Sequence, residues 1–207
     1  MLGEVHPFAS RGGLKLKHAL EQFKIDVEDK IALDIGASTG GFTDCLLQRG
    51  AAKVYAVDVG YGQLDWKLRK DARVICLDRT NARNLKRDDL EDDPHLAVVD
   101  VSFISLRLIL PPLFEILKQQ GELVALVKPQ FEVWKDEIEN KGIIKDPVKH
   151  TNVLLRLHKF ISEKLWVLRN IVESPIQGQK GNREYLIHCT HTGASINEED
   201  IRQVIVD

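Results

Sequence analysis

The residues with the clearest chemical potential lie in a glycine-rich turn at 36–41. An apolar run over 31–35 leads into this turn, and a helix pattern follows it. A second apolar run ends in Asp58. Strand, glycine turn, helix, strand and acid form the layout of a nucleotide-type cofactor site. Glycines let the backbone approach a ligand closely, and an acid at the tip of the second strand can accept hydrogen bonds from both hydroxyls of a ribose.

The sequence of this turn is compatible with three kinds of site. Gly36-x-Ser38-x-Gly40 has the form of a nucleophile elbow, with Ser38 as the nucleophile of a serine hydrolase. It also approximates a dinucleotide fingerprint, although Ser38 replaces the middle glycine and the final spacing differs. Asp34-x-Gly36-x-x-x-Gly40 has the form of an S-adenosylmethionine turn, in which an acid lies near the amino group of the cofactor. The last form fits best, so we expect Asp34, Gly36, Ser38, Gly40 and Gly41 to bind S-adenosylmethionine.

Charged residues also follow the later strands. Asp58, Asp78 and Asp100 end the second, third and fourth apolar runs, and Lys128 ends the fifth. Ligands of such sheets bind at the carboxyl ends of the strands. We therefore expect Asp58 to bind the cofactor ribose, Asp78 to lie beside its adenine, and Asp100 to lie beside both the cofactor and Lys128. A lysine beside an acid at this position is typical of a functional site, although a structural ion pair has the same pattern.

Apolar periodicity predicts the elements that position these residues. The alternation of strands and helices predicts an α/β fold, a doubly wound Rossmann-like sheet that is mostly parallel. The last two strands are joined by a loop at 174–181 without a helix, so we expect an antiparallel C-terminal hairpin, which favours a methyltransferase. The expected strands are 31–35, 53–58, 74–77, 95–100, 122–127, 166–173 and 183–190, and the expected helices are 41–49, 63–69, 104–118, 147–164 and 197–204, after a helical stripe of Leu14, Leu16, Ala19, Leu20 and Phe23.

Length predicts a single α/β domain over 1–207, and the cofactor turn together with the C-terminal hairpin favours a methyltransferase domain. We expect it to have an N-terminal helix segment at 1–30 and a charged, substrate-side flap at 131–146. Apolar residues make up 43% and charged residues 29%, and the net charge is −2, as in ordinary globular proteins. No apolar run has the length of a membrane span. The three cysteines are widely spaced, which is typical of reduced thiols. We expect a cytoplasmic protein with no metal site and no membrane partner.

Five motifs follow one another along the chain and together resemble a known family. Over nearly the whole chain, from Phe8 to Thr190, the sequence is similar to the TlyA-type, or haemolysin-A-like, ribosomal RNA 2′-O-methyltransferases, within the FtsJ-like ribose methyltransferases. The motifs read Ser10-Arg11-Gly12-Gly13-Leu14-Lys15-Leu16, Asp34-Ile35-Gly36-Ala37-Ser38-Thr39-Gly40-Gly41-Phe42-Thr43, Asp100-Val101-Ser102-Phe103-Ile104-Ser105-Leu106, Lys128-Pro129-Gln130-Phe131-Glu132 and Ser174-Pro175-Ile176-x-Gly178-x-x-Gly181-Asn182-x-Glu184-Tyr185.

The resemblance implies a Lys–Asp–Lys–Glu catalytic tetrad at Lys15, Asp100, Lys128 and Glu184. It also implies S-adenosylmethionine as the cofactor, a ribose 2′-hydroxyl of ribosomal RNA, on cytidine, as the acceptor, and ribosomal RNA or a ribosomal subunit as the partner. A 2′-hydroxyl is a poor nucleophile until it is aligned and loses its proton. Burial and a second cation favour the neutral amine of a lysine. Asp100 can then orient that amine and Glu184 can position the other lysine, while either lysine could be the base.

Two departures from the family pattern and two alternative functions remain. Family members carry a small N-terminal RNA-binding domain, whereas this chain begins almost at the first motif, so we do not expect RNA recognition by this chain alone. Val133-Trp134 stand where the family has small residues, which predicts a different flap shape. The alternatives are a membrane-active haemolysin and a serine hydrolase that uses Ser38.

Overall fold

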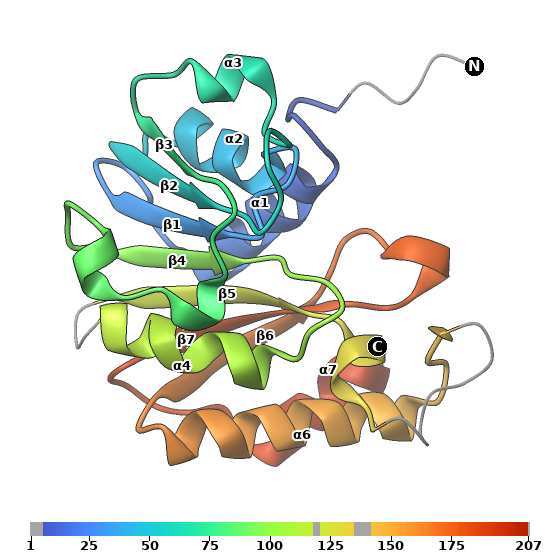
Figure 1. Ribbon diagram of the computed structural model, residues 1–207. Coiled ribbons are helices and arrows are strands. Elements are labelled where there is room, and N and C mark those ends of the chain that lie inside the picture. Colours follow the sequence, from blue (N-terminus) through green and yellow to red (C-terminus); the bar gives the residue numbers. More distant parts are fainter. Residues whose placement is uncertain (1–5, 118–120, 135–141, 207) are drawn as a thin grey trace.

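Seven strands form one sheet between two layers of helices in the computed structural model, which describes residues 6–117, 121–134 and 142–206 (Figure 1). The central strands are short and mostly apolar, as expected for strands that are covered on both faces. The strands are β1 (Ile31–Ile35), β2 (Lys53–Val57), β3 (Val74–Leu77), β4 (Leu96–Val99), β5 (Glu122–Val127), β6 (Val167–Glu173) and β7 (Tyr185–Thr190).

The order of the strands is β3-β2-β1-β4-β5-β7-β6. The first five are parallel, and β7 is inserted between β5 and β6, antiparallel to both. The predicted antiparallel hairpin and Rossmann-like fold are therefore confirmed. Because Tyr185 pairs with Val127, the start of β7 lies at the same edge as the carboxyl ends of the parallel strands.

The helices cover both faces of this sheet (Figure 1). The helices are α1 (Gly12–Phe23), α2 (Gly41–Gln48), α3 (Trp66–Arg69), α4 (Leu106–Leu117), α5 (Pro129–Glu132), α6 (Pro147–Glu163) and α7 (Glu198–Val206). Alternate residues of a strand point to opposite faces. Leu33 and Ile35 accordingly pack toward the layer of α4, α6 and α7, while Ala32 packs toward α1 and α2.

The predicted elements are all present, and their ends differ from the prediction by a few residues. β7 begins at Tyr185 rather than 183 because the chain before it belongs to a loop, in which Gly178 N donates to Asn182 O at 2.9 Å. Glu184 therefore lies at the entrance of β7. Of the expected flap at 131–146, residues 135–141 lie outside the described part of the chain.

Candidate active site

Gly36 brings the turn after β1 into contact with the end of β4. Its φ is +82°, a conformation that side chains other than glycine rarely adopt. A Cβ atom at this position would lie 2.5 Å from the carbonyl oxygen of Asp100. Gly36 N also donates to Val57 O at 2.9 Å, so the ends of β1, β2 and β4 converge on this glycine.

Gly40 and Gly41 lie where chain segments pack closely together, and their binding of the cofactor stays a prediction. A Cβ on Gly40 would lie 2.3 Å from Leu68 Cδ1, and a Cβ on Gly41 would lie 2.2 Å from Ser10 Oγ. Gly41 also lines a cavity, but Gly40 does not. These glycines let α2 approach α3 and the turn that precedes α1.

The carboxylate of Asp58 lies at the tip of β2 and faces a cavity, as predicted for a ribose-binding acid. Its Oδ2 accepts a hydrogen bond from Ser38 N at 2.8 Å, and its Oδ1 accepts one from Gly60 N at 2.7 Å. Each carboxylate oxygen has a second lone pair, so both remain able to accept a hydroxyl hydrogen. Ser38 contributes its backbone N–H to this contact, has φ +48°, and is among the residues that line both cavities.

Asp34 does not face the cofactor cleft, contrary to the sequence-based expectation. It is fully buried, and its Oδ2 accepts a hydrogen bond from Thr43 Oγ1 at 2.6 Å. Asp34 shares its strand face with Ala32, so its side chain points toward α2. The pKa of the Asp34 carboxyl is raised from 3.8 to about 7, mainly by burial and in smaller part by the neighbouring Asp100, while the hydrogen bond from Thr43 opposes the shift. Asp34 therefore has a structural role, because its hydrogen bond with Thr43 connects the end of β1 to α2 on either side of the glycine turn.

The shifted pKa of Asp34 predicts a pH dependence of folding stability. The unfolded chain ionises Asp34 near pH 3.8, whereas the folded protein keeps it protonated up to about 7, so Asp34 should contribute a fall of about 4 kcal/mol in the unfolding free energy across this window. Asp34→Asn stays neutral and retains an acceptor for Thr43, so this fall should be absent. Urea unfolding between pH 4 and 7 measures the difference, with the exposed Asp88→Asn as a control. Parallel curves for Asp34→Asn and the wild type would contradict the assignment.

Asp78 is also turned away from the cleft. Arg69 Nη2 donates to both of its carboxylate oxygens, at 3.0 and 2.8 Å, and this ion pair holds the side chain toward α3. The cavity wall next to it is formed instead by Thr80, Asn81 and Ala82. The residues that follow Asp78 are therefore at the cleft, but Asp78 itself is not.

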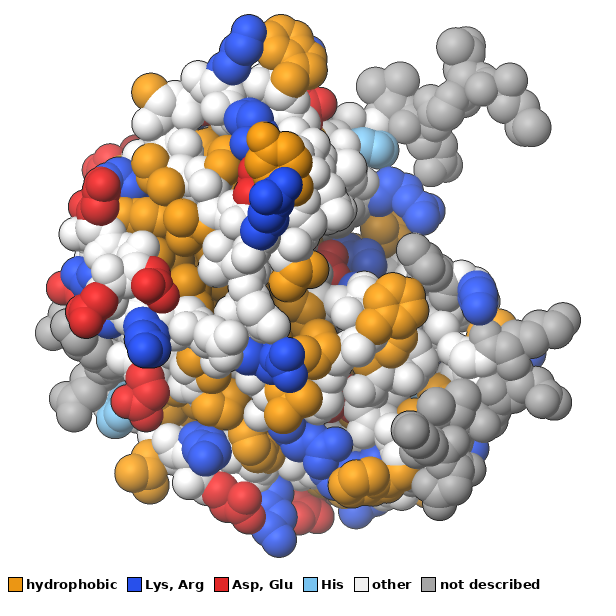
Figure 2. All heavy atoms as spheres, in the orientation of Figure 1, with side chains coloured by type: hydrophobic (Ala, Val, Ile, Leu, Met, Phe, Trp, Pro, Cys, Tyr) orange, Lys and Arg blue, Asp and Glu red, His pale blue; other side chains and the backbone are white. Residues whose placement is uncertain are grey.

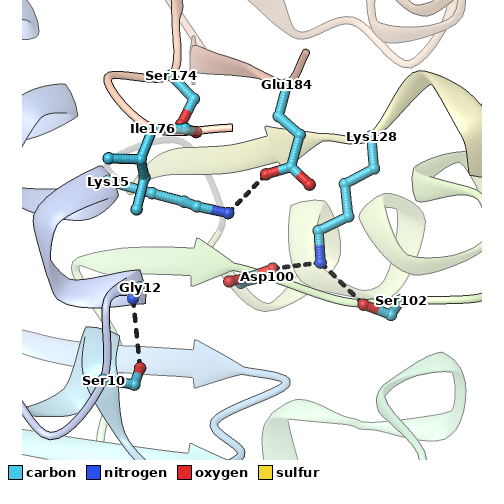
Figure 3. A network of polar contacts seen from close by, with 9 residues as sticks. All are labelled: Ser10, Gly12, Lys15, Asp100, Ser102, Lys128, Ser174, Ile176 and Glu184. Carbon is cyan, nitrogen blue, oxygen red and sulfur yellow. Dashed lines mark hydrogen bonds and ion pairs between the residues drawn. The ribbon is translucent and has the colours of Figure 1, made fainter. Parts of the chain in front are cut away.

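The four residues of the expected tetrad meet in one place (Figure 3). Lys15 Nζ donates to Glu184 Oε2 at 2.5 Å, although the two residues are 169 positions apart. Lys128 Nζ lies 2.6 Å from Asp100 Oδ1. The lysines come from α1 and the end of β5, and the acids come from the end of β4 and the entrance of β7. In Figure 3 both amines point into the space between these elements.

Ser102 and Phe103 are two site residues that the sequence analysis did not single out. Lys128 Nζ donates a hydrogen bond to Ser102 Oγ at 2.8 Å. Phe103 is 87% exposed at the mouth of the cleft and has φ +64°, a strained conformation for a bulky residue. Both belong to the motif that begins at Asp100. The signal in the sequence is an aromatic residue, Phe103, placed shortly after the polar residue that ends a strand, because such a residue lies at the ligand-binding edge of the sheet.

Two adjoining cavities form the cleft. The first, of about 320 Å³, is lined by all four members of the tetrad. The second, of about 540 Å³, extends from the turn after β1 past Asp58 to the segment after β3. Figure 2 shows charged side chains inside a hollow between the part of the surface over α1–α3 and the part below it. The residues that line both cavities are Gly36, Ser38, Asp100, Ser102 and Phe103.

This geometry does not support a serine hydrolase. No histidine is among the described residues that line the two cavities, so Ser38 has no imidazole base beside it. Within the described residues there is also no group of three or more His, Cys, Asp or Glu side chains placed to bind a metal ion. The charged groups at the junction of the cavities are instead the two ion pairs of the tetrad.

Sequence comparison gives consistent relatives. Residues 8–190 match the family described as FtsJ-like methyltransferase. The 16S/23S rRNA (cytidine-2′-O)-methyltransferase TlyA of Mycobacterium tuberculosis is 43% identical over 96% of this chain and 74% of its own length. Hemolysin A of Brachyspira hyodysenteriae is 46% identical over 87% of this chain and 76% of its own length. A solved structure from Streptococcus thermophilus, provisionally named a hemolysin, is 47% identical with a TM-score of 0.94, covering 99% of this chain and 75% of its own.

Fold and site together define an S-adenosylmethionine-dependent methyltransferase. The chain belongs to the FtsJ-like methyltransferase family. The residues present fit this cofactor, because Gly36 leaves no room for a side chain beside Asp100, Asp58 presents free acceptors for ribose hydroxyls, and the carboxylate of Asp100 at the junction suits a positively charged sulfonium. No helix among the described residues is long and apolar enough to span a membrane.

Proposed function

We propose that this chain transfers a methyl group from S-adenosylmethionine to the 2′-hydroxyl of a cytidine ribose in ribosomal RNA. The observation that carries the proposal is the pair of lysine–carboxylate contacts, Lys128 with Asp100 and Lys15 with Glu184, in the smaller cavity next to the cofactor cavity. The M. tuberculosis relative named above is a 16S/23S rRNA (cytidine-2′-O)-methyltransferase, and it is 43% identical to this chain over 199 residues.

The four side chains have different roles in the proposed methyl transfer. S-adenosylmethionine supplies an electrophilic methyl group. Lys128 takes the proton of the 2′-hydroxyl when its amine is neutral, and Asp100 and Ser102 fix the direction of that amine. Glu184 holds Lys15 at the opposite wall, where it positions the acceptor. The site therefore combines alignment of the acceptor with removal of its proton.

The target base is proposed to stack on Phe103. This side chain is highly exposed at the junction of the two cavities, and its ring lies 5.0 Å from that of Phe131. Aromatic side chains at such positions stack bases that have left a helix. The strained backbone of Phe103 is consistent with selection for binding rather than for folding.

Phe103→Ala should raise the Michaelis constant for RNA, because loss of one stacking contact weakens binding by about 1–3 kcal/mol, or roughly 5- to 150-fold. Phe103→Tyr retains the ring and should behave nearly as the wild type. Leu108→Ala removes another exposed apolar side chain and is the control. Steady-state methyl transfer to rRNA fragments measures the effect. Equal Michaelis constants for wild type and Phe103→Ala would exclude stacking at this position.

Mapping of ribose methylation in rRNA tests the proposed function as a whole. Ribosomes from cells with and without this protein are digested and analysed by mass spectrometry, and purified protein is then added to the unmethylated subunits with S-adenosylmethionine. We expect at least one cytidine to lose its 2′-O-methyl group without the protein and to regain it in the reaction. Liposomes that contain a fluorescent dye test the haemolysin alternative, since leakage caused by Lys128→Ala protein would show an activity independent of methyl transfer.

A further inference from the structure

Two loops carry most of the groups that surround the acceptor site. One loop, 100–105, connects β4 to α4, and the other, 128–132, follows β5 and contains the single turn α5. They are joined at one end by the contacts of Lys128 with Asp100 and Ser102. Their relative position therefore decides where the amine of Lys128 lies.

The same two loops are joined in the middle and at the far end. In the middle, the rings of Phe103 and Phe131 are in contact, with centroids 5.0 Å apart. At the far end, Glu132 Oε2 accepts a hydrogen bond from Ser105 Oγ, and its Oε1 accepts one from Leu106 N, each at 2.6 Å. Three successive contacts thus hold one loop against the other.

Glu132 is the buried member of these contacts, with 3% of its surface exposed. Leu106 is the first residue of α4, where backbone N–H groups have no partner within the helix. An acid at this position satisfies a free donor and lies favourably in the helix dipole. Glu132 lies in the segment after β5, whereas the helix that it caps, α4, follows the loop after β4. Its hydrogen bonds to Ser105 and Leu106 therefore also connect the two loops.

The surroundings of Glu132 leave its carboxylate little freedom. Arg107 Nε lies 3.9 Å from Oε2 on one side and 3.3 Å from Ser105 Oγ on the other. The guanidinium also lies over the ring of Trp134, 5.3 Å from its centroid. A side chain with two short hydrogen bonds and a packed cation beside it has a defined position. Because Glu132 ends α5 and Lys128 directly precedes this helix, fixing Glu132 also restricts the position of Lys128.

We infer that Glu132 is a positioning residue, which fixes the loop of Lys128 relative to the loop of Asp100, Ser102 and Phe103. This inference rests on the proposed function. Glu132 itself does not line either cavity, so it acts through the residues that do. Catalytic groups must be held to within a fraction of an ångström by surrounding contacts, which makes turnover sensitive to the loss of such a support.

Glu132→Ala should lower kcat for methyl transfer by about 10- to 100-fold, while calorimetry shows an unchanged affinity for S-adenosylmethionine. Glu132→Gln retains the side-chain length and an acceptor for Leu106, so it should retain more turnover than the alanine variant. Asn197→Ala removes a cap from α7, where Asp200 N donates to Asn197 Oδ1 at 2.9 Å, and is the matched control for loss of a cap. It should lower thermal stability without lowering kcat.

A double-mutant cycle separates positioning from a general loss of stability. In a Lys128→Ala background, Glu132→Ala should reduce the remaining turnover little further, because the amine that it positions is already absent. Independent, multiplicative losses would overturn the inference, as would a kcat for Glu132→Ala equal to that of the wild type.

Chemical labelling of lysines gives a readout that does not need turnover. An amine-reactive reagent followed by peptide mapping should label Lys128 faster in Glu132→Ala than in wild type, with exposed Lys17 as the internal reference. Unchanged labelling of Lys128 would contradict the inference. If wild type fails to methylate rRNA but Lys128 becomes selectively reactive in Glu132→Ala, the proposed function fails and the positioning role remains.

Discussion

Replacing Lys128 with alanine is expected to lower methyl transfer to rRNA by on the order of 10²-fold or more, the usual effect of losing a general base. The affinity for S-adenosylmethionine should remain nearly unchanged, since Lys128 lines the acceptor cavity and not the cavity that contains Asp58. Single-turnover transfer from labelled S-adenosylmethionine measures the first effect and calorimetry the second.

Lys128→Arg distinguishes a base from a fixed positive charge. Arginine can keep an ion pair with Asp100 but cannot lose its proton in a protein, so this variant should be about as slow as alanine. Lys17→Ala, on the exposed side of α1, should transfer methyl groups at the wild-type rate. Near-normal turnover in Lys128→Ala would show that this lysine is not the base, and recovery in Lys128→Arg would show that charge alone is required.

Asp58→Ala should weaken binding of S-adenosylmethionine by about 1.5–3 kcal/mol, or roughly 10- to 150-fold, the contribution of hydrogen bonds to a charged acceptor. In the free protein this carboxylate already accepts hydrogen bonds from Ser38 N and Gly60 N, so it is held in place before the ribose arrives. Calorimetric titration measures the change in affinity.

Asp78→Ala is the matched comparison for Asp58→Ala. Both residues are acids that follow neighbouring strands, but Asp78 is paired with Arg69 and faces away from the cleft. We expect its removal to change cofactor affinity little. Equal affinities for the wild type and Asp58→Ala would reject the ribose site, and a large loss in Asp78→Ala would show that the Arg69 pair opens when the cofactor binds.

The sequence by itself was sufficient to predict the Rossmann-like sheet, the C-terminal hairpin and the position of Asp58. These features depend on short-range patterns, because an apolar run of five residues, a glycine turn and a following acid are encoded within about 30 neighbouring positions. The family motifs added Lys15 and Glu184, which pattern alone could not separate from surface charges.

The directions of the other two acids were decided by the tertiary structure. Asp34 and Asp78 lie at predicted strand ends, yet one points toward α2 and the other toward Arg69. The alternation of side chains along a strand predicts that neighbouring residues face opposite sides of the sheet, but it does not predict which side borders the ligand. That choice depends on the helices that cover each face.

Only the tertiary structure brought Lys15 to Glu184 and Glu132 to the start of α4. Glu184 reaches the carboxyl edge because β7 is antiparallel and lies between β5 and β6, and Lys15 reaches it because α1 packs on this part of the sheet. Strand order arises from the burial of whole faces and from long-range pairing. Residues 169 positions apart therefore meet through contacts that no local pattern specifies.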